Sequence, residues 1–292
     1  MKNGIYTDLS IEDYHANKTH YSSTGIKHAK KSLKEFWYYK QGLYDHGYVS
    51  HFDFGNAMEL ALLDHSEFAD KVEIFDETQR PEPDKTFGSK LNKEWKQNFI
   101  DKAQQENKYV IPKSGNDSFE TVECLLDSCY RDKTIQALLK NVEYQSSIFW
   151  TDKNTGLNLK TRPDVIKSRK NAIIDVKTTT DGSPEEFKRA MVKYDYPIQA
   201  TTQIDGVVSG GLMEKLDHYF WLVLEKNPPY SATLYEFTPE DRVFIEEQYR
   251  FLLSRIARAD ELDFYPGYSD RADNKHGIIQ ASIPPYYGVY KT

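Results

Sequence analysis

The sequence predicts an α/β or α+β domain with a mixed β-sheet at its centre. Three observations support this class. Helical patterns dominate the first 140 residues, short apolar runs separated by polar turns follow between 147 and 177, and helices and a strand then alternate up to residue 263. We expect one domain over 1–263, with a helical part at 1–140 and a sheet core at 141–263. Residues 264–292 are expected to form an extended tail.

The helical part contains three predicted helices and one long polar excursion. Ser22 or Ser23 is a suitable N-cap for the first helix. The second helix is apolar and carries a single acid, Glu59. Residues 77–95 are rich in Pro, Asp and Lys and are predicted to be a loop. The helices are predicted at 22–40, 54–63 and 118–139.

The sheet core begins with strand patterns and ends with helices. A polar turn at 152–156 separates the first two strands, and a second polar turn at 168–171 closes a hairpin. The strands are predicted at 147–150, 159–167, 172–177 and 218–224. The later helices are predicted at 184–193, 197–209 and 239–259.

Two acids and a lysine fall on the predicted hairpin. If the turn is centred on 169–170, antiparallel pairing sets Asp164 opposite Asp175, with Cβ atoms roughly 4.5–5.5 Å apart. Alternation along the strand places Lys177 on the same face as Asp175. Two carboxylates that close repel each other unless a cation lies between them, so we predict a divalent metal there. A charged hairpin without chemistry is the alternative, and a one-residue register shift would turn Asp164 away.

Composition narrows the classes of protein. The 292 residues carry a net charge of −7, which argues against coating nucleic acid by bulk charge. No apolar run approaches the length of a membrane span and no signal-peptide pattern starts the chain, so we expect a cytoplasmic protein. Cys124 and Cys129 are expected to be small buried residues rather than a disulfide. A local basic strip could contact DNA or be a solvated helix face; it comprises Lys27, His28, Lys30, Lys31 and Lys34, followed by Tyr38 and Tyr39.

Other residues extend the predicted site. Glu59 is either at the solvent edge of its helix or a third metal ligand. Mg²⁺ prefers oxygen ligands in octahedral geometry, so Glu59, Asp164, Asp175 and the backbone carbonyl of Val176 would suit it, and Mn²⁺ would substitute. Beside the metal, Lys177 would stabilise charge that develops on a phosphate. Gln199, near a helix N-terminus, is either an ordinary polar residue or a contact to a phosphate or to the hairpin.

Taken together, these segments resemble the PD-(D/E)XK nuclease superfamily, and more closely the exodeoxyribonuclease VIII group of RecE-type phage or prophage exonucleases. The Pro-Asp and Asp-x-Lys pieces are shared across the superfamily, whereas Phe-Trp-Thr-Asp followed by Thr-Gly and Arg-Pro-Asp is more specific. The resemblance covers most of the span 21–225. The segments that carry it are Tyr21 to Thr24, Phe54 to Glu59, Ser147 to Asp152, Thr155 to Gly156, Lys160 to Asp164, Ile174 to Thr179 and Tyr196 to Gln199.

The resemblance implies a restriction-endonuclease-like core, metal binding by Asp164 and Asp175, and a catalytic role for Lys177. We also expect Arg162, Thr178 and Gln199 to contact the substrate. Two departures stand out. The group commonly has His where this chain has Glu59, and its Gln-x-x-x-Tyr pattern is Gln199 followed by Gln203 here. With two cysteines, the iron–sulphur members of the superfamily are excluded.

The predicted function is magnesium-dependent exonuclease activity on double-stranded DNA. The resemblance implies 5′-to-3′ degradation from DNA ends, which leaves 3′ single strands for an annealing protein in recombination. It also implies a ring-shaped homo-oligomer. One alternative is a structure-specific or sequence-specific endonuclease on the same fold, and another is a catalytically silent DNA-binding module.

Overall fold

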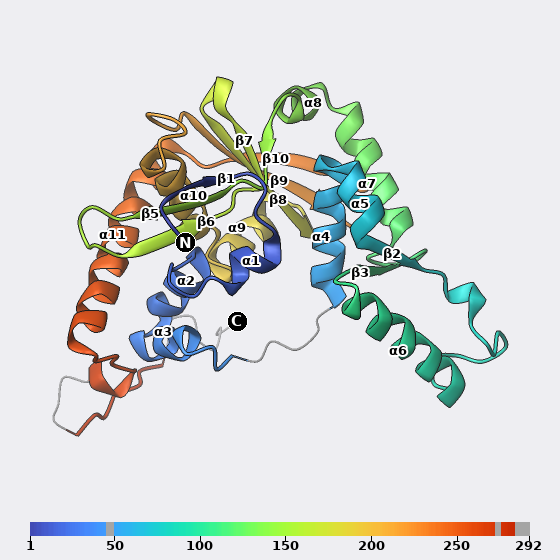
Figure 1. Cartoon of the computed structure of the whole chain (residues 1–292), viewed down its shortest axis with the longest axis horizontal. Coiled ribbons are helices and arrows are strands. Elements are labelled where there is room, and N and C mark those ends of the chain that lie inside the picture. The colour runs from blue at the N-terminus through green and yellow to red at the C-terminus, as the bar shows by residue number, and fades with distance from the viewer. Residues whose placement is uncertain (45–49, 272–275, 284–292) are drawn as a thin grey trace, which may run out of the picture.

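The computed structural model describes residues 1–44, 50–271 and 276–283, and a five-stranded mixed sheet lies at its centre (Figure 1). The strands run in the order β10-β9-β8-β7-β4. β8 and β9 are parallel, whereas the other neighbours are antiparallel. The predicted α/β class with a mixed central sheet is therefore confirmed. The strands are β4 (Glu143–Tyr144), β7 (Val165–Lys167), β8 (Ala172–Thr179), β9 (His218–Glu225) and β10 (Ala232–Glu236).

A smaller antiparallel sheet contains β1 (Gly4–Tyr6), β5 (Ser147–Thr151) and β6 (Asn158–Thr161). The single strand predicted at 159–167 is wrong, because β6 and β7 belong to different sheets. The chain changes sheets at Pro163, which has no N–H to donate to a ladder. The break places Asp164 where the two sheets diverge.

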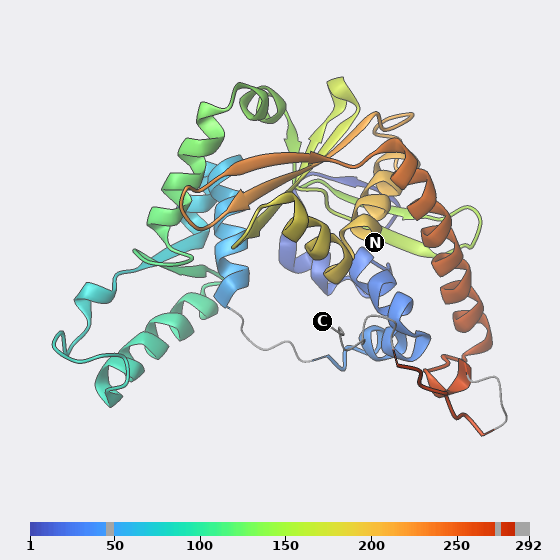
Figure 2. The same ribbon diagram turned by 180° about the vertical axis from the view of Figure 1, so that it is seen from behind.

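Helices cover both faces of the central sheet (Figures 1 and 2). On one face, α9 (Pro184–Lys193), α10 (Tyr196–Ser209), α11 (Pro239–Leu262) and α2 (Ser23–Lys31) bury Ile173 and Trp221. On the other face, α4 (Ser50–Leu63) and α7 (Phe119–Arg131) bury Ile174 and Leu222. The later helices and β9 agree with their predicted ranges within three residues. Four shorter helices are α1 (Ile11–Ala16), α3 (Leu33–Lys40), α5 (His65–Lys71) and α8 (Lys133–Leu139).

Two predicted helices are each split by one capping residue. Ser32 is extended, with φ −161°, and its hydroxyl accepts a hydrogen bond from the N–H of Glu35, so the predicted 22–40 helix is α2 followed by α3. Asp132 likewise ends α7 and begins α8, because its carboxylate accepts from the N–H groups of Thr134 and Ile135. The single helix predicted at 118–139 is therefore wrong, because two helices meet at Asp132.

The polar segment between residues 72 and 112 forms an arm beside α4 (Figure 1). It contains the parallel pair β2 (Val72–Phe75) and β3 (Tyr109–Pro112), the short η1 (Glu77–Gln79) and the helix α6 (Lys90–Gln105). The loop predicted at 77–95 is wrong from residue 90 onward. The rings of Trp95 and Phe99 pack on Phe75, with centroids 4.8 and 5.0 Å away, and this contact outweighs the polar composition.

The motif Phe-Trp-Thr-Asp has a structural role. Asp152 closes the predicted turn by accepting hydrogen bonds from the N–H and hydroxyl of Thr155, at 2.8 and 2.6 Å. Its other oxygen is 2.9 Å from the guanidinium of Arg250 on α11. Arg250 also pairs with Asp205 of α10 at 2.9 Å, and Trp150 donates to Asp205 at 3.3 Å. One buried charge network therefore ties the small sheet to α10 and α11.

The start of the predicted tail packs on the body. The ring of Tyr265 lies against Phe36, and its hydroxyl donates to Asp260 at 2.8 Å. Residues 272–275 and 284–292 of that tail lie outside the described residues. Both cysteines are free; Cys129 is buried and Cys124 half-buried. None of the helices in the described part of the chain has the length and apolarity that a membrane span requires.

Candidate active site

The hairpin has the register that the sequence predicted. Val165 pairs with Ile174 and Lys167 with Ala172, and continuing this ladder by one residue sets Asp164 opposite Asp175. Oδ2 of Asp164 accepts a hydrogen bond of 2.7 Å from the N–H of Val176. Asp175 is completely buried and forms an ion pair with the ammonium of Lys177. The two acids and the lysine therefore occupy one locality on adjoining strands.

Glu59 reaches this locality from α4. Its Oε1 accepts a 2.9 Å hydrogen bond from the side-chain amide of Gln145, so it is not a residue at the solvent edge. The oxygen of that amide lies 3.3 Å from Arg162. Arg162 also donates 2.8 Å bonds to the carbonyl of Leu9 and the hydroxyl of Ser147. Arg162 thus contacts the N-terminal segment and, through Gln145, orients Glu59.

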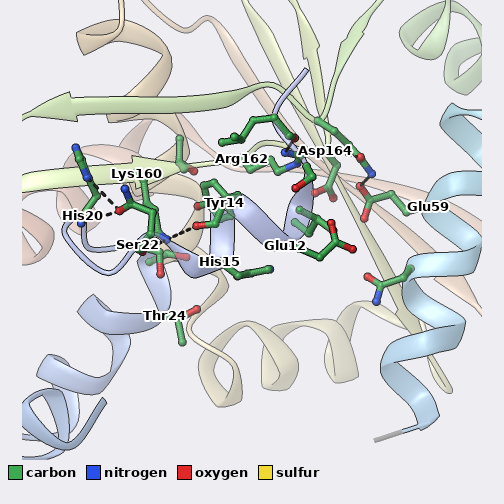
Figure 3. A pocket seen from close by; sticks show the side chains of 18 of the residues that line it. Glu12, Tyr14, His15, His20, Ser22, Thr24, Glu59, Lys160, Arg162 and Asp164 are labelled. Atoms are coloured by element: carbon green, nitrogen blue, oxygen red, sulfur yellow. Dashed lines mark hydrogen bonds between the residues drawn. The ribbon is translucent and has the colours of Figure 1, made fainter. Parts of the chain in front are cut away.

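A cleft of about 890 Å³ opens beside these residues (Figure 3). Glu59, Asp164 and Arg162 lie at one end of the view, and Lys160, His20 and Ser22 at the other. The lining is mainly polar and includes Gln199 and Gln203. Lys160 donates 2.6 Å bonds to the carbonyls of Tyr14 and Asn17, so it holds the C-terminal end of α1 against the small sheet.

The carboxylates interact strongly with one another. Burial, together with the charges of Glu59 and Asp175, raises the pKa of Asp164 well above its ordinary value. Burial likewise raises the pKa of Glu59, with a smaller contribution from Asp175. Burial acts in the opposite sense on Lys177, but the negative charges of Asp175 and Asp164 outweigh it and raise the pKa of the ammonium. The site therefore holds a permanently charged lysine beside acids that resist losing their protons.

The donor set suits a divalent cation, although no described group of three acid, histidine or cysteine side chains is already arranged to hold one. Oδ2 of Asp175 is a buried oxygen whose partner among the described residues is the ammonium of Lys177, with no amide or hydroxyl donor. Asp164 and Glu59 each accept one hydrogen bond in the structure. Carboxylates whose pKa is raised by burial and by each other's charge fit Mg²⁺ chemically, because a cation would offset both effects.

The remaining predicted residues lie around this centre. Gln199 does not point to open solvent: its amide donates to Asp175 at 3.1 Å, and Gln203 donates to the same oxygen at 3.2 Å. Strand alternation places Thr178 on the opposite face, toward α4, where it is half-buried. In the predicted basic strip, Lys27 lies 3.4 Å from Gln199, and Lys30 forms an ion pair with Asp195 at the start of α10.

A sequence family described as a PDDEXK-like domain of unknown function (DUF3799) matches residues 22–276, which is most of the chain. The chain belongs to this family. The predicted membership of the PD-(D/E)XK superfamily and the restriction-endonuclease-like core are thereby confirmed. The narrower exodeoxyribonuclease VIII group stays a prediction.

Solved structures support the fold of this PDDEXK-like chain. A "Putative exonuclease" from Eubacterium rectale is similar over 96% of both chains, with a TM-score of 0.59 and 14% sequence identity. At that identity the likeness concerns the fold alone. The structure of SSO0001 is 13% identical over 78% of this chain and 93% of its own, but its TM-score of 0.30 is too low to indicate a shared fold. No curated protein matches the chain.

Sequence reasoning missed Gln145 and Tyr219 of this PDDEXK-like site, and it named Lys27 and Gln203 without their contacts. Gln145 comes from a segment far from the hairpin, and nothing local marks it. Lys27 was expected only as part of a basic strip that contacts DNA or solvent. Tyr219 lies on β9 on the same face as Asp175, but its role depends on the parallel pairing of β8 with β9. Gln203 carried a usable signal, since residues four apart on a helix share a face and Gln199 was already a candidate.

Proposed function

We propose that this protein is a metal-dependent deoxyribonuclease that degrades double-stranded DNA from its ends. The supporting observation is that Asp164, Asp175, Glu59 and Lys177 gather within a PDDEXK-like nuclease fold, beside a polar cleft that Asp164 and Glu59 line. Three acids and one lysine in such a place match the needs of phosphodiester hydrolysis.

In this proposal Mg²⁺ is held by Asp164, Asp175 and Glu59, with the carbonyl of Val176 as a further oxygen ligand. When bound, it would supply Lewis-acid chemistry by lowering the pKa of water and offsetting charge on the phosphate. Lys177 remains charged because its acid neighbours raise its pKa, so it provides a fixed positive group for the phosphate oxygens. Gln145 and Arg162 keep Glu59 turned toward the site.

The first prediction concerns activity. Linear duplex DNA with Mg²⁺ should be shortened from its ends, while covalently closed plasmid should stay intact. Asp175→Asn should lower the rate at least about 10²-fold, since it removes one of the two facing carboxylate charges. The measurement is release of acid-soluble nucleotides, with Asp181→Asn, an exposed acid at the β8–α9 turn, as the matched control.

The alternatives predict different outcomes of the same assay. Rapid cutting of closed circles would favour an endonuclease on this fold. Retention of all measurable behaviour by Asp175→Asn would favour a silent DNA-binding module.

The finer part of the proposal comes from the resemblance to RecE-type exonucleases. Degradation would run 5′ to 3′, a ring-shaped homo-oligomer would hold the duplex, and an annealing protein would receive the 3′ strand. Duplexes labelled at either 5′ or 3′ ends distinguish the polarity, because early release of the 3′ label would contradict it. Light scattering coupled to gel filtration measures the oligomeric state; a monomer would contradict the ring.

A further inference from the structure

Asp175 is held by two glutamine amides on one oxygen. Its carboxylate is completely buried, and Oδ1 accepts from Nε2 of Gln199 at 3.1 Å and from Nε2 of Gln203 at 3.2 Å. Oδ2 forms an ion pair with the ammonium of Lys177 and has no amide or hydroxyl donor among the described residues. The two oxygens of one carboxylate are thus in different environments. The amides engage Oδ1 and leave Oδ2, on the side of Lys177, without an amide donor.

A glutamine amide can point either end at a neighbour, so something must fix its orientation. For Gln199 that neighbour is Lys27, whose Nζ lies 3.4 Å from Oε1. Burial lowers the pKa of Lys27 to about 8, and below that pH its ammonium has donors and no acceptor. The amide oxygen then faces Lys27 and the NH₂ faces Asp175. Reversing the amide would set its oxygen against a carboxylate oxygen and its NH₂ against an ammonium.

The second amide is oriented by a hydroxyl. Tyr219 donates to Oε1 of Gln203 at 2.7 Å from the neighbouring strand β9. Burial, with the charges of Asp175 and Asp164, raises the pKa of Tyr219 well above its ordinary value, so the hydroxyl keeps the proton that it donates. The ring is completely buried between α10 and the sheet, which fixes the direction of that donor.

We propose that Lys27 and Tyr219 are positioning residues that orient Gln199 and Gln203, so that Oδ1 of Asp175 is occupied and Oδ2 is the oxygen offered to a divalent cation. This inference rests on the proposed function and deepens it. It also gives position 203 a place in the site, since its side chain contacts Asp175 rather than the substrate. Neither Lys27 nor Tyr219 touches the reacting atoms.

The test measures cation binding without DNA. Tyr219→Phe removes one hydroxyl, and Lys27→Met removes one ammonium while keeping the chain length. Each should weaken Mn²⁺ binding by about 10-fold, because partners that orient metal ligands contribute about 10- to 100-fold to affinity. Calorimetric titration of the full chain gives this value. Lys27→Arg should restore binding, because guanidinium is also a donor without an acceptor.

Tyr235→Phe is the matched control. Its hydroxyl also donates a 2.7 Å bond, but to the backbone carbonyl of Gly182, with no link to Asp175. It should leave Mn²⁺ affinity unchanged. In the DNA assay, Tyr219→Phe and Lys27→Met should lower kcat while leaving KM for DNA within about twofold, since neither residue contacts DNA in the proposal.

Side-chain amide NMR separates a failed inference from a failed function. In the cation-free protein, the NH₂ resonances of Gln199 should shift in Lys27→Met and those of Gln203 in Tyr219→Phe. Unchanged amide resonances and Mn²⁺ affinity in folded variants would overturn the positioning role, whatever the wild type does to DNA. If the wild-type chain cut no DNA while both amides shifted, the proposed function would fail and the orientation of the amides would stand.

Discussion

At the scale of single residues, the site concentrates negative charge where burial makes it costly. Asp164 and Asp175 face each other across a hairpin, and Glu59 approaches from a helix. The pKa of Asp164 is raised rather than lowered, which is the reverse of an acid stabilised by a salt bridge. In the absence of a cation, the ionised carboxyl therefore opposes folding.

This sign leads to a stability prediction for Asp164→Asn. A group whose pKa is raised by folding contributes stability below its ordinary value of 3.8, and that contribution is lost as the pH rises through the raised value. In chelator, the variant should therefore melt above the wild type at pH 8, and the difference should vanish toward pH 4. Thermal unfolding across that range measures it, and a variant that melts lower at pH 8 would contradict it.

Asp76 provides a control with the opposite sign. Hydrogen bonds from Thr78 and Lys113 lower its pKa to about 2. Its stabilising contribution is therefore present above pH 3.8 and is lost as the pH falls toward 2. Asp76→Asn should lower the melting temperature at pH 8, where Asp164→Asn raises it.

At the scale of elements, sequence patterns located regular structure better than its interruptions. The register of the β7–β8 hairpin could be predicted from the position of its turn. A shift of one residue would have turned the side chain of Asp164 to the face opposite Asp175. The breaks at Ser32, Asp132 and Pro163 were missed, since each depends on one residue competing with a longer periodic run. Helix α6 was missed because its partner, Phe75, lies fifteen or more residues away.

Sequence patterns were limited in the same way for the residues of the site. Asp164, Asp175 and Lys177 could be found from sequence because one hairpin carries all three. Gln145 and Tyr219 could not, because tertiary packing alone brings them near Glu59 and Gln203. Lys27 was a candidate DNA contact, but its contact with Gln199 also depends on tertiary packing.

The buried network around Arg250 gives a prediction for α11. Arg250→Met leaves the carboxylates of Asp152 and Asp205, which are 5 and 6% exposed, without their cation. We expect a loss of about 3 kcal/mol in the free energy of unfolding. Arg258→Met on the same helix removes an exposed pair with Glu261 and should cost less than about 1 kcal/mol. Urea unfolding measures both; equal midpoints for the two variants would refute the network's role.

At the scale of the whole molecule, an acidic chain with a net charge of −7 has a cleft lined at one end by the acids Glu59 and Asp164. Such a molecule repels a phosphate backbone unless cations neutralise the site. The two sheets diverge at Asp164, and α4 and α10 approach that point from opposite faces of the central sheet. A cation bound there would link these elements through carboxylates that otherwise repel one another. Cation binding should therefore stabilise the whole domain.

The resulting prediction is that a divalent cation stabilises the entire domain. A ligand that binds the folded state alone at 100 times its Kd adds about 2.7 kcal/mol to the free energy of unfolding. For a domain of this size we expect the melting temperature to rise by about 5–10 °C. Mn²⁺ should produce this rise at pH 8 and little of it at pH 4, where Asp164 and Glu59 keep their protons. Asp175→Asn should abolish the rise, whereas an equal shift in that variant would place the cation elsewhere.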